Sequence, residues 1–155
     1  MDEFLDVTPS RDCALLVRYL QLCASRNCSI RRGEHVANRM GGELWYLKPF
    51  LNHHGIVLTV EFAGSTGHQF LALDFGRRGL TWEIFEEFSE VEDEVFRAPF
   101  NVECGMEDLA AFVTNPKPFN FFTYDCQVWT EEALQLLNPT GAGSRKVKRR
   151  RSSWC

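Results

Sequence analysis

The sequence predicts an α+β fold, in which a small antiparallel sheet packs against helices within a single domain, residues 1–140. Between residues 56 and 85, apolar runs rich in β-branched and aromatic residues alternate with glycine-containing turns, the pattern of successive antiparallel strands. Near each end of the domain, apolar residues recur at the spacing of an amphipathic helix. With 155 residues, 45% apolar and 25% charged, the chain is large enough to build one soluble domain with a sizeable core.

The first predicted helix begins at Thr8-Pro9, because threonine suits the N-cap and proline the first helical position. Apolar residues at helical spacing carry this helix to about Ser25. The polar and basic residues 26–32 are then predicted to form a loop. Residues 33–40 are predicted to form a short helix that Gly41-Gly42 ends.

Three strands are predicted next, over residues 56–62, 68–75 and 80–85. The aromatic-rich residues 44–50 lead into them, and Pro49 breaks any strand there. Glycines between the three runs supply two tight turns. The strands should therefore form an antiparallel meander.

An acidic connection, residues 86–94, follows the meander and is most simply a solvated loop. Residues 95–102 are predicted to form a further strand, which Pro99 limits. Residues 106–113 are predicted to form a short helix, with acidic side chains near its start, where the helix dipole favours them.

The last predicted helix begins at Cys126 and ends before Asn138-Pro139. Asp125 can cap it, because its carboxylate can accept from free backbone N–H groups one turn on. Free N–H groups and the helix dipole at this end favour a thiolate over a thiol. A thiolate beside a base can attack a carbonyl carbon, so Cys126 is the candidate nucleophile. The alternative is that Cys126 is one more small buried side chain.

Two consecutive histidines, His53 and His54, lead into the first strand of the meander. Side chains on an extended segment alternate between its faces, so only one of these two rings can face Cys126. The residues themselves leave open which one it is.

A strand histidine followed by a helix-start cysteine resembles the circularly permuted papain-like superfamily, which includes PPPDE thiol hydrolases, lecithin:retinol acyltransferase-like enzymes and NlpC-type enzymes. The family pattern His-x-x-(Ile/Val)-x-(Val/Leu) is similar to residues 53–58. Its later block, which ends in Asn-Cys-x-x-aromatic, is similar to residues 119–129. The resemblance covers the middle and last third of the chain. It implies a permuted papain-like arrangement, with His53 as the base and His54 as the alternative base.

The same resemblance implies a residue that orients the base. In the acyltransferase-like enzymes a second histidine follows the first across a short hairpin, and His68 fits that placement, with Gln69 and Asp74 as alternatives. An oxyanion would be held by the backbone N–H of Cys126 and a second donor. Two neighbours could supply that donor, Gln127 or Tyr124.

The resemblance implies acyl transfer through a thioester, without a cofactor or a metal. We expect a Cys-His hydrolase of isopeptidase, peptidase or thioesterase type, whose substrate is a protein conjugate or an acyl thioester. One alternative is a lecithin:retinol acyltransferase-like enzyme that acts on phospholipid. Another is a non-catalytic binding module on the same fold, because Asp125 stands where the family usually has asparagine.

Six scattered cysteines and an acidic N-terminus without signal-peptide character predict a cytoplasmic or nuclear protein whose cysteines stay thiols. No apolar run is long enough to span a bilayer. A zinc site built from Cys13, Cys23, Cys28 and His35 is disfavoured, because the chain has no C-x-x-C pair.

Residues 141–155 are predicted to be a flexible basic tail that is separate from the fold. The net charge of the whole chain, with the tail included, is −4. Its positive charges gather between Arg145 and Arg151. Such a block can bind a nuclear import receptor or an anionic membrane. We expect no direct role with nucleic acid.

Overall fold

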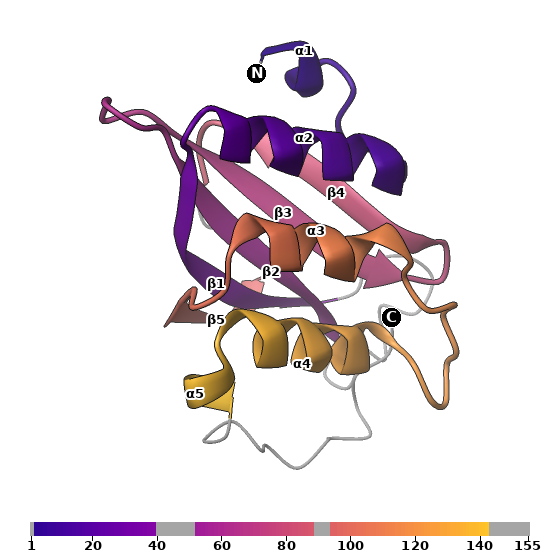
Figure 1. Cartoon of the computed structure of the whole chain (residues 1–155). Coiled ribbons are helices and arrows are strands. Elements are labelled where there is room, and N and C mark those ends of the chain that lie inside the picture. The colour runs from indigo at the N-terminus through magenta and orange to yellow at the C-terminus, as the bar shows by residue number, and fades with distance from the viewer. Residues whose placement is uncertain (1, 40–51, 89–93, 143–155) are drawn as a thin grey trace.

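The computed structural model describes residues 2–39, 52–88 and 94–142. Five strands in these ranges form one antiparallel sheet in the order β4-β3-β2-β1-β5 (Figure 1). The strands are β1 (Ser29–Arg39), β2 (Asn52–Glu61), β3 (His68–Gly76), β4 (Gly79–Phe85) and β5 (Glu94–Asn101). The predicted meander is therefore confirmed as β2-β3-β4, and β1 and β5 extend it on one side.

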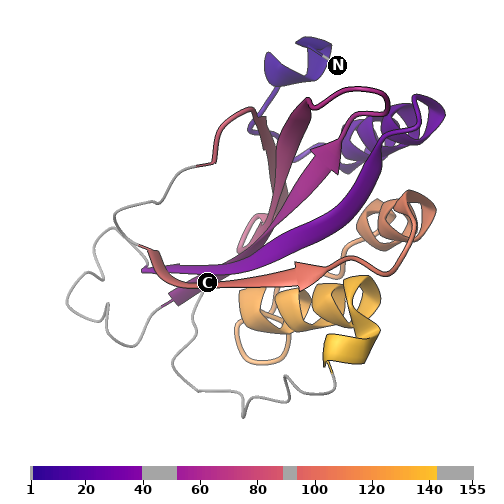
Figure 2. The ribbon, with the colours of Figure 1, turned by 90° about the vertical axis from the view of Figure 1, so that its left-hand side faces the viewer.

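Five helices accompany the sheet within the described residues. They are α1 (Asp2–Leu5), α2 (Cys13–Ser25), α3 (Met106–Thr114), α4 (Cys126–Leu137) and α5 (Pro139–Ala142). Figures 1 and 2 show α2, α3 and α4 side by side on the same face of the sheet. The α+β class and the antiparallel sheet packed against helices are confirmed.

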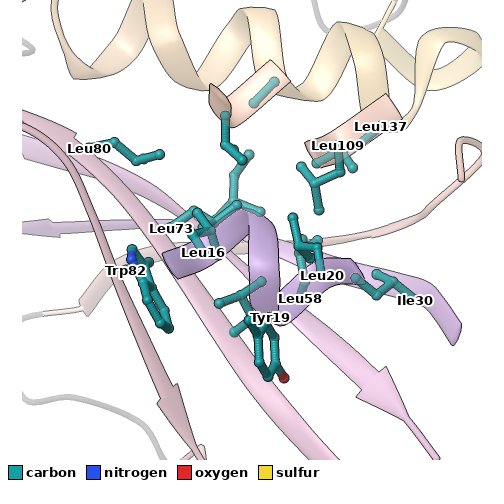
Figure 3. Packing of buried hydrophobic residues seen from close by; sticks show 14 of the residues in the cluster. Leu16, Tyr19, Leu20, Ile30, Leu58, Leu73, Leu80, Trp82, Leu109 and Leu137 are labelled. Atoms are coloured by element: carbon teal, nitrogen blue, oxygen red, sulfur yellow. The ribbon is translucent and has the colours of Figure 1, made fainter. Parts of the chain in front are cut away.

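The core lies between that sheet face and the three helices. Along β3, Leu71, Leu73 and Phe75 are buried while the residues between them are partly exposed, which is the period of two expected for a strand covered on one side. Leu16 and Tyr19 of α2 pack onto this face (Figure 3). Burying these apolar surfaces is the main free-energy gain that holds the helices on the sheet.

The prediction for residues 26–40 was wrong in its main feature. Instead of a loop and a short helix, β1 pairs with β2 on one side and β5 on the other. Gly33 shows how close this packing is, because a Cβ there would lie 2.7 Å from Phe100 Cζ and 2.8 Å from Leu58 Cδ2. Pairing along both edges outweighs the weak local preference of this segment for a helix.

The first long helix begins later than predicted. Asp12, not Thr8, is the N-cap of α2, and its carboxylate accepts from Leu15 N–H at 3.0 Å. Thr8 and Pro9, joined by a cis peptide bond, lie before the helix. The predicted end at Ser25 is confirmed.

Several predictions lie wholly or partly outside the described residues. These concern the aromatic-rich residues 44–50, part of the acidic connection at 89–93, and the basic tail from 143 onward. The tail's first residues, up to Ala142, belong to α5. Among the described residues, no helix has the length and apolar character needed to cross a membrane.

Candidate active site

Phe75, near the end of β3, anchors the segment that carries Cys126. Its ring stacks on Trp129 of α4 with centroids 6.0 Å apart and planes 6° apart. Phe75 also meets the edge of Tyr124 at 5.4 Å and lies 6.1 Å from Phe119. These contacts hold the start of α4 over the end of β3, because each ring gains packing energy only in a defined orientation.

Asp125 caps α4 as predicted. Its carboxylate accepts from Val128 N–H at 3.0 Å, and its backbone carbonyl accepts from Trp129 N–H at 3.0 Å. Cys126 is therefore the first residue of the helix.

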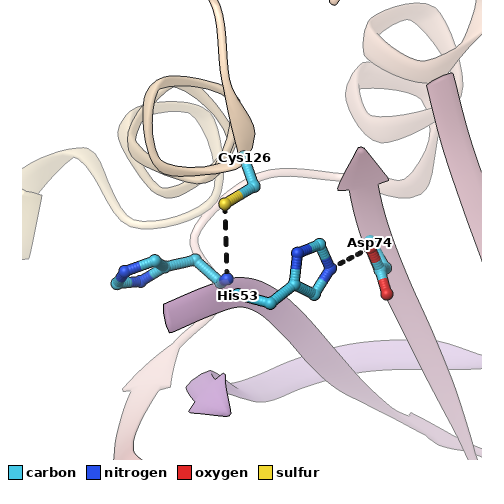
Figure 4. Close-up of polar contacts among 4 residues, drawn as sticks. His53, Asp74 and Cys126 are labelled. Carbon is cyan, nitrogen blue, oxygen red and sulfur yellow. Dashed lines mark hydrogen bonds and ion pairs between the residues drawn. The ribbon is translucent and has the colours of Figure 1, made fainter. Parts of the chain in front are cut away.

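The Cys126 sulfur lies against the backbone of β2, where it accepts from His54 N–H at 3.5 Å (Figure 4). Cys126 is fully buried and disulfide-bonded in this structure. The other four described cysteines are free thiols. The expectation that every cysteine stays a thiol is therefore not met at Cys126.

His53 and Asp74 form a pair across two neighbouring strands. Gly55 is the residue opposite Asp74, so His53, two positions before Gly55, points to the same face as Asp74. The Nε2 atom of His53 bonds the Asp74 carboxylate. Leu73 and Phe75, on either side of Asp74, face the helices, so by strand alternation the His53–Asp74 pair lies on the other face of the sheet from α4. Figure 4 marks this pair and, separately, the contact of the Cys126 sulfur with the backbone N–H of the next residue, His54.

His54 points to the other face of β2 and is buried there. Its Nδ1 atom lies 3.0 Å from Nε2 of His35 on β1, so one of the two rings donates a hydrogen bond to the other. Burial, followed by the effect of neighbouring His53, lowers the pKa of His54 from 6.5 to about 4, against the opposing effect of Asp125. His54 is therefore a neutral ring at pH 7.

The two remaining histidines lie elsewhere on the sheet. His35 is partly buried against His54 and Phe96. His68 is exposed at the opposite end of β3, where it faces Glu61 of β2. Nothing brings His68 near Cys126, since six strand positions, roughly 20 Å, separate it from Asp74.

Of the two alternatives to His68, Gln69 also lies at the far end of β3. It is buried, and its Oε1 atom accepts from the Tyr19 hydroxyl at 3.1 Å. Asp74 is the only one of the three candidates that contacts a histidine of β2 within the described residues. The strand register decides between them, and a single sequence does not contain that information.

The oxyanion candidates also have defined positions. The Tyr124 hydroxyl donates to Glu132 Oε2 at 2.7 Å, so it is turned toward α4 rather than held free for a substrate. Burial and the Glu132 carboxylate raise the pKa of Tyr124 above its usual range. The Gln127 side chain donates to Glu131 at 3.5 Å, and its backbone N–H lies in the first turn of α4 beside Cys126.

No group of three metal-ligating side chains gathers within residues 2–39, 52–88 and 94–142. Of the residues considered for zinc, Cys13 begins α2 while Cys23 lies in its last turn. In comparisons with known proteins, no family model, curated protein or solved structure matches this chain.

Proposed function

We propose that this chain is a thiol-dependent hydrolase that works through a thioester acyl-enzyme. Cys126 is the nucleophile, His53 is the base, and Asp74 orients the base. The observation that carries the proposal is the His53–Asp74 pair, one residue along β2 from the His54 N–H that contacts the sulfur of a helix-start cysteine. Nucleophile, base and orienting group are the three parts that acyl transfer by a thiol requires.

The choice of His53 over His54 follows from their surroundings. A general base must take up a proton near the working pH, and a ring whose pKa is about 4 is a weak base at pH 7. His53 instead bonds a carboxylate, which can hold the ring in place and stabilise its protonated form. Because Asp74 occupies Nε2, Nδ1 is the nitrogen left to accept the thiol proton.

In the proposed reaction, His53 Nδ1 takes the proton of Cys126 while the sulfur attacks the substrate carbonyl carbon. The resulting oxyanion lies at the start of α4, where first-turn backbone N–H groups, such as that of Gln127, can donate to it. His53 then gives its proton to the leaving group and the thioester forms. Water, deprotonated by His53, cleaves the thioester and restores the thiol.

The chain order supports a permuted papain-like arrangement. The base lies on β2, its orienting residue on β3, and the nucleophile follows at the start of α4. In this proposal Asp74 takes the place that the sequence assigned to His68. We assign the substrate to the class of protein conjugates or acyl thioesters, with water as the acceptor.

The reaction requires a reduced and accessible Cys126. In the described state the sulfur is bonded to another sulfur and has no exposure to solvent. The disulfide must therefore be reduced and the sulfur uncovered before a substrate can reach it. The His53 ring must also come within reach of the sulfur, whose described hydrogen bond comes from the backbone N–H of His54. Activity should depend on a reductant.

The proposal can be tested with p-nitrophenyl acetate, a small activated ester. After reduction, the wild-type chain should release a burst of about one equivalent of p-nitrophenolate and carry an acetyl group on Cys126, which tandem mass spectrometry locates. The unreduced chain and the Cys126→Ser variant should give no burst. Cys104→Ser is the matched control, because Cys104 is half-buried and also adjoins a helix start, that of α3.

Acetylation of Cys104 or Cys13 instead of Cys126 in the reduced chain would contradict the proposal and favour a binding module. If an acetyl-enzyme forms but transfers to a phospholipid amine faster than to water, the acyltransferase alternative is the correct one. Both outcomes are distinguishable in a single time course followed by mass spectrometry.

A further inference from the structure

A second sulfur site lies away from Cys126, where α2 ends and β1 begins. Arg26 is the C-cap of α2, and Asn27 adopts a left-handed conformation with φ of 56°. Cys28 N–H donates to Cys23 C=O at 2.9 Å, and Asn27 N–H donates to Ala24 C=O at 3.2 Å. These two bonds define a Schellman motif, in which the chain reverses at the helix end.

This motif brings two side chains together that are five positions apart. In a Schellman motif, the two residues in the positions of Cys23 and Cys28 usually make an apolar contact with each other. Here both are cysteines: Cys23 belongs to the core cluster, and Cys28 packs against that cluster. The helix end therefore holds a dithiol in a fixed backbone geometry.

The two thiols differ in their access to solvent. Cys23 is fully buried within the core, whereas Cys28 is only partly buried. The Tyr19 hydroxyl contacts the Cys23 sulfur and donates to Gln69 Oε1 at 3.1 Å. Burial raises the pKa of Cys23 to about 12. An oxidant from solution therefore meets Cys28 first, and Cys23 lies directly behind it.

We propose that Cys23 and Cys28 form a redox-active dithiol that hydrogen peroxide closes to a disulfide and a small dithiol reductant reopens. Peroxide first converts the Cys28 thiol to a sulfenic acid and is itself reduced to water. The Cys23 sulfur then displaces the sulfenic oxygen, which leaves as a second water, and the S–S bond forms. In the reverse direction, two thiols of the reductant become its own disulfide.

Closing this bond would tie the last turn of α2 to the first residues of β1. Both thiols are free in this structure, so it represents the reduced state of the site. The Schellman motif already sets the backbones of the two residues close together. The proposal is independent of the function proposed for Cys126.

Peptide mapping can test the proposal, because trypsin cleaves after Arg18, Arg26 and Arg31 and so separates the two cysteines. The full chain is reduced, freed of reductant, treated with one to a few equivalents of hydrogen peroxide, alkylated and digested without reduction. A disulfide would then link peptide 19–26 to peptide 27–31. We expect this linked pair to be the main product involving the four free cysteines, and to disappear after dithiothreitol treatment.

Two variants separate proximity from general oxidation. Cys28→Ser should abolish the linked pair, while Cys13→Ser, which removes a partly exposed thiol at the other end of α2, should leave its yield unchanged. Phenylarsine oxide, which binds two adjacent thiols with loss of water, should add to the reduced wild-type chain and to Cys13→Ser but not to Cys28→Ser. Sulfinic acid at Cys28 without a link, or links spread evenly among Cys13, Cys28 and Cys104, would overturn the proposal.

Discussion

The hairpin of β2 and β3 carries a histidine near each end, and the two ends differ in what surrounds the ring. At one end His53 bonds Asp74, and the backbone N–H of the next residue, His54, donates to the buried sulfur of Cys126. At the other end His68 is exposed and packs edge-on against Phe70 at 5.1 Å. Its cross-strand neighbour Glu61 pairs with Arg32 instead, at 3.7 Å.

This difference shows that a histidine is a better candidate base when one of its ring nitrogens is bonded to a carboxylate. A ring that has a carboxylate on one nitrogen is held in orientation, and its other nitrogen is left for a substrate or a nucleophile. His68 has an aromatic neighbour but no such partner among the described residues. The functional end of the hairpin is therefore recognised by Asp74 as much as by His53.

The largest expected effect is the loss of the base. His53→Ala should slow acylation of reduced Cys126 by p-nitrophenyl acetate about 10²- to 10⁴-fold, the usual contribution of a general base. Burst kinetics measure this rate. Circular dichroism should show an unchanged fold, and a variant that keeps the wild-type rate would exclude His53 as the base.

The next effect concerns the neighbouring ring, His54, and appears in stability. Its folded pKa of about 4 lies below the unfolded value of 6.5, so between these pH values the unfolded chain binds a proton that the folded chain does not. Stability should fall as the pH is lowered from 6.5 to 4, by about 3 kcal/mol from this group. Urea unfolding at pH 7 and pH 4 measures the loss.

The matched control is His54→Gln, which should remove most of that pH-dependent loss relative to wild type. The pH dependence of stability that remains in the variant would then come from other titrating groups. An identical pH dependence in the variant and in the wild type would contradict the assignment of a neutral, buried His54.

The loss of the orienting carboxylate should be smaller than the loss of the base. Asp74→Ala removes a hydrogen bond to a charged ring worth about 1.5–3 kcal/mol, which corresponds to a roughly 10- to 100-fold slower acylation. Asp74→Asn should lose less, since an amide oxygen can still accept from the ring. An Asp74→Ala variant that keeps the wild-type acylation rate would argue against this role.

The smallest expected effect is that of His68→Ala, the counterpart at the other end of the hairpin. An exposed residue without a partner carboxylate should change stability by no more than about 0.5 kcal/mol. The acylation rate should stay within about twofold of wild type. A loss comparable to that of His53→Ala would show that the two ends of the hairpin have been assigned the wrong way round.

The elements whose signals are local could be predicted from the sequence. Strands β3 and β4 were expected within one residue of their observed bounds, and β2 was expected to begin four residues later than it does. Their side chains alternate and glycines mark the turns. Gly64 and Gly79, with φ of 72° and 92°, show why glycine is required at those turns. Asp125 was expected to cap α4, because capping depends only on residues within one turn.

The features that depend on distant pairing could not be predicted. Strand β1 has little apolar alternation of its own, and it exists because β2 and β5 satisfy its backbone on both sides. The contact between His53 and Asp74 depends on the register of β2 against β3. The proximity of Cys23 and Cys28 has a local signal in the sequence, because only four residues separate the two cysteines at the end of a helix.

The strand order β4-β3-β2-β1-β5 has a consequence for the time course of folding. Strands β2, β3 and β4 are joined by short turns. Strand β5 pairs with β1 although β2, β3 and β4 lie between them in the sequence, as in the pairing of Arg32 with Asn101. Contacts between distant residues form after local hairpins, because closing a long loop costs more chain entropy. In pulsed hydrogen exchange we expect amides of β2 and β3 to be protected before those of α4. A refolding chain would then pair His53 with Asp74 before Cys126 reaches them.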